Sequence, residues 1–443
     1  MNVKALLDID LVALESTEKV TMMLDMTAPI TDAAKSRPGQ AVEIVLDRSG
    51  SMSGPVFESA KESILKLIER LAPQDSFGLI AFDDQALIIS PIRTMADHDL
   101  PALRKVIREM QTGGQTDISA GYTMGLRELS RVATDAGATL LLISDGHANT
   151  GEMVPATFSQ IAATHATNKI TTSTIGLGTG YDEKILEALA QGGNGAHRFA
   201  YTIDEAIGAI AAEVTDLLEK SVVNAVMRFT PNPSLTTNPR VEVLQRLPHF
   251  MDGDTYVVQL GDIYAGENRR FVLDIEVPGM PALGLATIAE ITLEYLDIAT
   301  MQEISVSMPV QVNVVPDDVA KGRTADPVVR AERLILTAQT EKATAIEELR
   351  SGNNRGAASR LKSTAENLRR EASTIRVTDD RTAESLQIIT TEADEMEVLA
   401  RSAEFDEISY SSKRLNENFS EKSRARKMRN RDENPKTQDD YLN

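Results

Sequence analysis

VEIVLDRSGSM, residues 42–52, is the stretch that decides the fold. It begins as a short, mostly apolar run, typical of a strand that is covered on both faces of a parallel sheet. Asp47, Ser49 and Ser51 follow at alternating positions where the strand gives way to a Ser/Gly turn. Loops at the carboxyl edge of a parallel sheet converge on a crevice that usually holds the ligand. The stretch therefore predicts an α/β fold with a polar site directly after its first strand.

The sequence that follows alternates apolar strands with amphipathic helices as far as residue 220. The strand patterns are SFGLIAF, ALIIS, ATLLLIS, ITTSTIGLG and AHRFAY, and helical patterns lie between most of them. Such alternation indicates βαβ units and a sheet with helices on both faces. We predict a Rossmann-like, doubly wound, mostly parallel sheet over residues 40–220.

The flanking segments predict a second, antiparallel domain. Residues 221–316 read as strands joined by polar or Pro/Gly connections, which indicates a β-sandwich. Residues 1–39 hold two alternating strand patterns, and a lone strand pair cannot bury its own apolar face. We therefore expect these N-terminal strands to join the later sandwich, so that the α/β domain is inserted into it.

Helical periodicity without strands returns near the C-terminus. Asp326 and Pro327 form a helix start, and the apolar spacing over residues 326–409 predicts three amphipathic helices in a small bundle. Residues 410–443 are polar and contain KSRARKMRNR, a run with six basic residues. We expect a flexible polar tail there.

Composition narrows the partners and the compartment. The chain has 443 residues, a formal charge of −20 and no Cys, so disulfides and thiolate metal sites are excluded and nucleic acid is a disfavoured partner. No apolar run approaches the roughly 18 residues of a membrane span. Asp8, Asp10 and Glu15 interrupt the opening stretch where a signal peptide needs an apolar core. We predict a cytoplasmic protein without a membrane partner.

Two further oxygen donors are expected at the same sheet edge. Thr116 lies in TGGQTDIS, a Gly-rich loop that opens a helix, and Asp145 ends the strand in LLLISDG. Together with Asp47, Ser49 and Ser51 they make three hydroxyls and two carboxylates, the hard oxygen ligands that Mg²⁺ prefers. Each of these residues alone is also a common helix cap.

The combination DxSxS, then Thr in a Gly-rich loop, then a strand-terminal Asp-Gly closely resembles the von Willebrand factor A domain family, over residues 41–220. The resemblance implies a metal-ion-dependent adhesion site formed by Asp47, Ser49, Ser51, Thr116 and Asp145. It implies Mg²⁺, or Mn²⁺ or Ca²⁺, as the cation. It also implies a non-enzymatic protein-interaction scaffold whose partner offers an Asp or Glu to the metal.

Other readings of the same residues fit less well. An EF-hand loop needs Gly where Met52 stands, and a phosphoaspartate phosphotransferase usually has a second carboxylate where Ser49 stands. Gly176, Gly178 and Gly180 do not match the dinucleotide spacing. A Mg²⁺-dependent phosphohydrolase and a purely structural assembly protein stay open as alternative functions.

Overall fold

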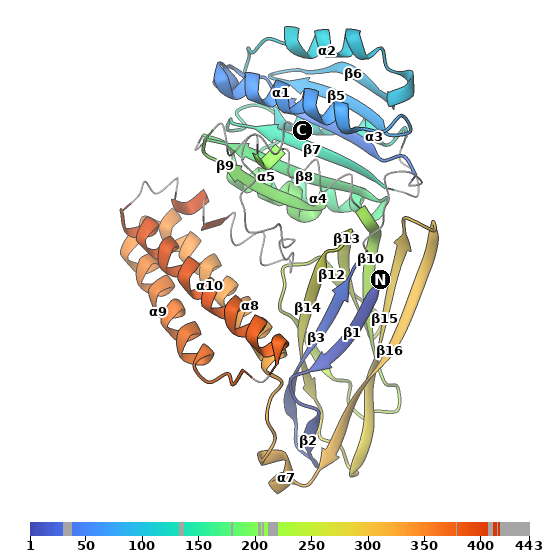
Figure 1. The fold of residues 1–443 in the computed structure, drawn as a ribbon, viewed down its shortest axis with the longest axis vertical. Helices are drawn as coiled ribbons and strands as arrows, with labels where there is room; N and C mark the ends of the chain where they lie inside the picture. The colour runs from blue at the N-terminus through green and yellow to red at the C-terminus, as the bar shows by residue number, and fades with distance from the viewer. Residues whose placement is uncertain are drawn as a thin grey trace.

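The computed structural model describes residues 1–29, 38–132, 137–178, 180–202, 205, 208–210, 220–377, 379–405, 411–413 and 415–416. Its architecture has three parts, an α/β domain, a β-sandwich and a group of C-terminal helices (Figure 1). The sandwich lies below the α/β domain in this view, and the helices lie beside both.

The α/β domain is built on a six-stranded sheet in the order β6-β5-β4-β7-β8-β9. All neighbours are parallel except β5 and β6, so the antiparallel strand lies at one edge. The central strands are buried along their whole length, which matches their apolar sequences. The strands are β4 (Ala41–Asp47), β5 (Ser76–Phe82), β6 (Ala86–Thr94), β7 (Ala138–Ser144), β8 (Ile170–Leu177) and β9 (Asn194–Ala200).

Helices cover both faces of this sheet. One core contains side chains of α1 (Pro55–Arg70) and α2 (Leu100–Glu109), and the other contains side chains of α3 (Ile118–Leu129), α4 (Pro155–Thr167) and α5 (Glu183–Gly192). The predicted doubly wound sheet is confirmed. The amphipathic pattern IDEAIGAIAAEVTDLLEK, residues 203–220, predicts a further helix, and most of this stretch lies outside the described residues.

The β-sandwich pairs a sheet in the order β1-β3-β14-β11 with a sheet in the order β12-β13-β10-β15-β16-β2. One apolar cluster fills the space between the two sheets. The strands are β1 (Asn2–Leu7), β2 (Leu11–Ala13), β3 (Glu18–Thr27), β10 (Lys220–Pro231), β11 (Arg240–Val243), β12 (His249–Asp252), β13 (Thr255–Tyr264), β14 (Asn268–Val277), β15 (Gly284–Asp297) and β16 (Gln302–Val315).

The N-terminal strands belong to this sandwich. β3 pairs antiparallel with β14 over its full length, from Glu18↔Val277 to Thr27↔Asn268. The insertion of the α/β domain into the sandwich is therefore confirmed. The apolar alternation from Val3 to Leu11 predicts one strand, but β1 ends at Leu7. The chain turns there, and β2 pairs in parallel with β16 of the opposite sheet.

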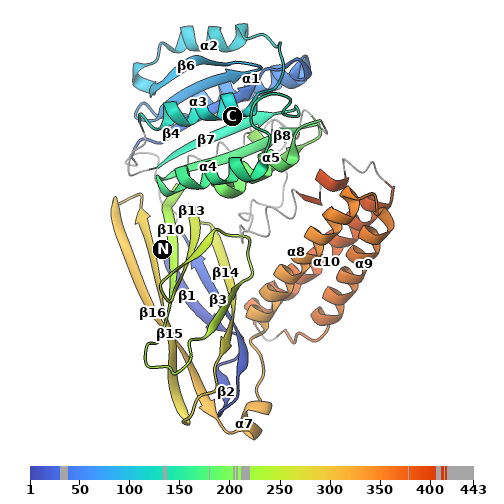
Figure 2. The same cartoon turned by 180° about the vertical axis from the view of Figure 1, so that it is seen from behind.

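Three long helices follow a short one, as the periodicity predicts. They are α7 (Asp317–Lys321), α8 (Pro327–Arg350), α9 (Asn354–Ala372) and α10 (Asp380–Phe405). The Asp326 carboxylate accepts hydrogen bonds from the first amides of α8, at 2.8 and 3.2 Å, and Pro327 occupies the first helical position. Val328, Val329 and Leu336 of α8 pack with Met23 and Val272 of the sandwich. Figure 2 shows α8 beside the sandwich.

We expected a flexible polar tail from residue 410 onward, but the structure buries residues beyond that point. Lys413, Leu415 and Asn416 are buried, and Leu415 belongs to the apolar core of the C-terminal helices. These residues look like a tail in the sequence because their burial depends on a surface of the distant α/β domain. Residues 417–443, including the basic run, lie outside the described residues.

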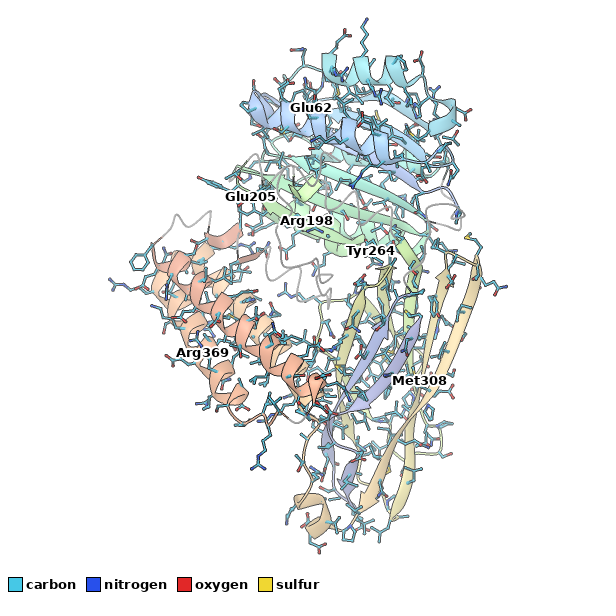
Figure 3. All side chains as sticks on the ribbon, in the orientation of Figure 1. Glu62, Arg198, Glu205, Tyr264, Met308 and Arg369 are labelled. Atoms are coloured by element: carbon cyan, nitrogen blue, oxygen red, sulfur yellow. The ribbon has the colours of Figure 1, made fainter. Side chains whose placement is uncertain are left out.

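A buried ion pair joins the α/β domain to the sandwich. The Lys220 ammonium lies 2.7 Å from a carboxylate oxygen of Asp262 in β13 and donates to Thr139 in β7 at 2.9 Å. Thr171 in β8 donates to the same carboxylate oxygen. Tyr264, which pairs with Lys220 between β13 and β10, marks this junction in Figure 3.

Across the part of the chain that the structure describes, we find no helix with both the length and the apolar character of a membrane span.

Candidate functional site

The structure brings all five predicted site residues together at the carboxyl edge of the α/β sheet. Asp47 is the last residue of β4, and Ser49 and Ser51 lie in the turn that precedes α1. Asp145 directly follows β7, the neighbour of β4. Thr116 lies in the loop before α3. The chain leaves β4 and β7 toward opposite sides of the sheet, which makes this edge a topological switch point.

The oxygen atoms of these residues converge on one point. The Ser51 hydroxyl donates to Asp145 Oδ1 at 2.7 Å and lies 3.1 Å from the Ser49 hydroxyl. A methyl group added to Gly146 would lie 2.9 Å from Thr116 Oγ1, 3.4 Å from Ser51 Oγ and 3.5 Å from Asp47 Oδ2. Three loops that are far apart in the sequence therefore present their oxygens around Gly146.

The site has a closed side and an open side. Asp47, Ser49 and Thr116 are at most 3% exposed, whereas Ser51 is exposed and Asp145 is half-buried. On the buried side the Asp47 carboxylate is fixed by the Ser49 amide, which donates to Asp47 Oδ1 at 2.7 Å. Among the five candidate site residues, Ser51 and Asp145 are therefore the ones that a ligand can reach from solvent.

Burial raises the pKa of both carboxyl groups. The pKa of Asp47 is above its ordinary value because burial outweighs the hydrogen bonds that this group accepts from Ser144 and Ser49. Burial also raises the pKa of Asp145 to about 6; the hydrogen bond from Ser51 opposes that shift, and the negative charge of Asp47 adds to it. The two acids are therefore both partly desolvated, and each resists ionisation without a cation nearby.

Two residues that support this geometry are not evident in the sequence. The Ser144 hydroxyl donates to Asp47 Oδ2 at 2.5 Å, yet Ser144 reads only as the last residue of an apolar strand. The Asn149 side chain accepts from the Thr116 amide at 2.9 Å, and the Asn149 amide donates to the Thr116 carbonyl at 3.1 Å. The position of Ser144 beside Asp145 is the one signal that could have found it.

Arg48, which follows Asp47 in the chain, belongs to the support of the site. Its guanidinium lies 2.6 Å from a carboxylate oxygen of Asp83, and the Arg48 carbonyl accepts from the Gly113 amide at 2.8 Å. Asp83 in turn accepts, through its backbone carbonyl, from the Asp117 amide at 2.8 Å. Asp117 itself caps α3. These bonds fix the Thr116 loop against the turn that follows β4.

The donor set fits a hard divalent cation. Among the described residues, no three acidic or His side chains gather closely enough to hold a metal ion by themselves. The candidate site instead combines two carboxylates with three hydroxyls, all oxygen donors of the kind that Mg²⁺ and Mn²⁺ take. Neutral hydroxyls would leave a bound cation electrophilic toward an anionic oxygen from outside.

Comparison with known families and proteins agrees with this arrangement. Residues 42–213 match the family model described as the von Willebrand factor type A domain. An uncharacterised protein, sll0103 of Synechocystis sp., is 26% identical over 334 residues, which cover 73% of this chain and 77% of that protein. Inter-alpha-trypsin inhibitor heavy chain H3 of Rattus norvegicus is 24% identical over 278 residues, 59% of this chain but only 30% of that protein.

Two solved structures share the fold over nearly the whole chain. A von Willebrand factor type A protein from Catenulispora acidiphila has a TM-score of 0.69 at 16% identity and covers 90% of this chain and 96% of its own. The ArnB paralog VWA2 from Sulfolobus acidocaldarius has a TM-score of 0.60 at 16% identity and covers 89% of this chain and 98% of its own. The family match and the doubly wound sheet together identify residues 42–213 as a von Willebrand factor type A (VWA) domain.

Proposed function

We propose that this protein is a divalent-metal-dependent interaction module that holds a protein partner through its VWA domain. In this proposal Asp47, Ser49, Ser51, Thr116 and Asp145 hold Mg²⁺ or Mn²⁺, and the cation takes an Asp or Glu carboxylate of the partner. VWA domains typically serve adhesion and protein interaction, which supports the general class. The sandwich and the C-terminal helices then act as the scaffold that presents the site.

The observation that carries the proposal is the convergence of five oxygen donors around Gly146. Three loops from separate parts of the chain supply them. The hydrogen bond from Ser144 to Asp47 and the one from the Thr116 amide to the Asn149 side chain hold two of these loops in place. A set of helix caps would not need to meet at one point. When bound, the cation would supply an electrophilic centre on the open side, next to Ser51 and Asp145.

A partner carboxylate is the ligand that suits this site. The chain carries a formal charge of −20, so long-range electrostatics do not attract an acidic partner. An acidic residue must therefore be captured by the cation itself, at short range. A single metal–carboxylate bond would anchor the centre of the interface, and we expect the rim to contribute less.

The phosphohydrolase alternative has weaker support. Arg48, the cation beside Asp47 in the chain, is ion-paired with Asp83 and supports the loop. His147 follows Gly146, but its side chain is well exposed and lies 4.0 Å from Asp182. Neither residue forms a phosphate clamp with the site.

The cytoplasmic location stays a prediction from the sequence.

Calorimetric titration of the full chain with Mg²⁺ and with Mn²⁺ tests the proposal. The parent should bind one cation, and the double variant Ser49→Ala/Ser51→Ala should lose that binding with only a small loss of stability, because each change removes a single hydroxyl group and its hydrogen bond. Ser59→Ala/Ser63→Ala is the matched control, since both hydroxyls donate to backbone carbonyls within α1, those of Pro55 and Ser59. Equal binding by the two double variants would refute the site assignment.

The partner and enzyme alternatives are separated with the same variants. Partner capture should require Mg²⁺, reverse with EDTA, and fail for Ser49→Ala/Ser51→Ala while persisting in the control. It should also disappear when one acidic residue of the captured partner is replaced. Hydrolysis of a generic phosphate monoester that depends on both Mg²⁺ and these serines would instead favour the phosphohydrolase.

A further inference from the structure

The loop between β8 and α5 lies directly against the Asp145 turn. The Asp182 amide donates to the Gly146 carbonyl at 3.2 Å. A methyl group added to Gly180 would lie 3.2 Å from the Asp145 carbonyl oxygen, so the two backbones are in close contact. Asp182 also caps α5, through its carboxylate and the Ile185 amide. A shift of this loop must therefore shift the turn that carries Asp145, or break its bond to Gly146.

The C-terminal part of the chain grips this loop from outside. The Lys413 ammonium donates to the Tyr181 carbonyl at 2.8 Å and lies 3.6 Å from the centre of the Tyr181 ring. The Asn416 side chain donates to the Glu187 carboxylate in α5 at 3.1 Å. At the C-terminal end of α8, Arg350 is ion-paired with Glu183, at 3.2 Å.

These contacts are built into the core of the molecule. Lys413 and Asn416 are 5% and 2% exposed, and the Leu415 side chain packs with the apolar residues of α8–α10. Burial lowers the pKa of Lys413 to about 8, with Glu183 and Asp182 opposing the shift. A lysine that bears this cost is held by its partners, not left at the surface.

Tyr181 transmits the grip to the sheet. Its hydroxyl lies 3.2 Å from His197 Nε2, and its ring lies over Gly176 of β8, where any side chain would collide with it. Thr174 donates its hydroxyl hydrogen to the Leu186 carbonyl, so it must accept from His197 Nδ1. In the neutral imidazole, Nε2 is then the acceptor for the Tyr181 hydroxyl. The ring is thus fixed at both ends, by Lys413 and by the sheet.

We propose that Lys413, Asn416 and Arg350 form a latch through which the C-terminal region controls cation binding at the VWA site. The latch holds the β8–α5 loop, and the loop holds the Asp145 turn in the geometry that brings the five oxygens together. Release of the latch lowers the affinity for a divalent cation, because the turn is then no longer pre-organised. The proposal rests on the proposed function, since it concerns the regulation of the same site.

The coupling must act in both directions. If the latch tightens the cation site, an occupied cation site tightens the latch by the same factor. A protein that binds α8–α10 and displaces the segment of Lys413 would therefore weaken a ligand held at the VWA site. Coupling between sites typically changes affinity about 5-fold to 150-fold.

The test uses the full chain with Lys413→Ala/Asn416→Ala, and with Glu183→Gln as a second variant that breaks the latch from the VWA side. The matched control is Lys362→Ala/Asn367→Ala on α9, where Lys362 is paired with Glu404 of α10. Amide hydrogen exchange without added cation is the first readout. We expect residues 145–151 and 180–187 to exchange at least about five-fold faster in the latch variants and unchanged in the control.

Calorimetry with Mg²⁺ is the second readout. The dissociation constant should rise at least about five-fold in both latch variants and not in the control. Unchanged exchange at residues 145–151 would overturn the latch whether or not the chain binds a cation. Faster exchange with an unchanged dissociation constant would also overturn it, while leaving the proposed function intact. A parent that binds no divalent cation refutes the proposed function, and the latch as a control of cation binding falls with it.

Discussion

Replacing Lys220 by Met should destabilise the chain more than any surface lysine replacement. The Lys220 side chain is fully buried and the Asp262 side chain is 7% exposed, with 2.7 Å between their charged atoms. The variant keeps the apolar stem but leaves the Asp262 carboxylate buried without its cation. Breaking a buried pair in this way costs about 3–5 kcal/mol, whereas an exposed pair is worth about 0–1 kcal/mol.

Urea unfolding of the full chain measures this cost. At an m-value of about 3 kcal/mol/M, the loss corresponds to a midpoint lowered by about 1–1.7 M. The matched control is Lys321→Met, because Lys321 and its partner Asp317 are both largely exposed. The control should stay within about 1 kcal/mol of the parent. A Lys220→Met variant that matches the control would refute the reasoning.

The pH dependence of the stability loss in Lys220→Met gives an independent check on this reasoning. Burial alone would raise the pKa of Asp262, but Lys220 and the hydrogen bonds from Thr171 and Asn224 outweigh it and hold the pKa below its ordinary value. In the parent this contribution is therefore present above pH 3.8 and is lost only as the pH falls through the lower folded value. Without Lys220, burial raises the pKa and the carboxyl group protonates earlier. The deficit of the variant should thus be smaller at pH 5 than at pH 7.5, and a deficit that grows on acidification would contradict the argument.

Three further variants test other parts of the structure. Gly146→Ala should abolish Mg²⁺ binding in calorimetry, because its methyl group would lie 2.9 Å from Thr116 Oγ1 and would force that hydroxyl out of the convergence point. Glu43→Gln should stabilise the chain by about 1 kcal/mol or more at pH 8 and less at pH 5 in urea unfolding. Glu43 is fully buried, and neither of its carboxylate oxygens has a hydrogen-bond partner among the described residues. Burial, and to a lesser extent the charge of Glu128, raises the pKa of Glu43 well above its ordinary value. The parent therefore loses stability as the pH rises, and the neutral Gln does not. The Lys413 ammonium should titrate near pH 8 by NMR, whereas in the unfolded chain it keeps its proton up to about pH 10.5. As the pH rises from about 8 to about 10.5, the parent should therefore gain stability relative to Lys413→Met.

The fold was largely predictable because its signals are local. The apolar run that ends at Asp47 and the matching run before Asp145 mark two buried parallel strands, and both end at the same sheet edge. Asp326 and Pro327 mark the start of α8 through capping chemistry that involves only the next turn of helix. In each case the residues that reveal the element also stabilise it.

The remaining features depend on contacts between distant residues. β2 has three residues and joins the sheet opposite to β1, which no local pattern indicates. The Ser144 hydroxyl supports Asp47 across 97 positions of sequence. Lys413 lies in a polar segment, and only the Tyr181 surface of the VWA domain makes its burial favourable. Sequence periodicity reports which face of an element is apolar, and it does not report which distant surface covers it.

The VWA domain contacts the sandwich at the amino edge of its sheet and the C-terminal region at the carboxyl edge. At the amino ends of β7 and β8, Thr139 and Thr171 join the buried Lys220–Asp262 pair, which ties the sheet to the sandwich at a high cost of separation. At the carboxyl ends, the VWA domain meets the C-terminal region at the β8–α5 loop, through partners such as Lys413 and Tyr181. A perturbation in the C-terminal helices therefore reaches the candidate cation site while the junction with the sandwich stays fixed. That asymmetry is what a regulated site needs, because the scaffold must not move when the site does.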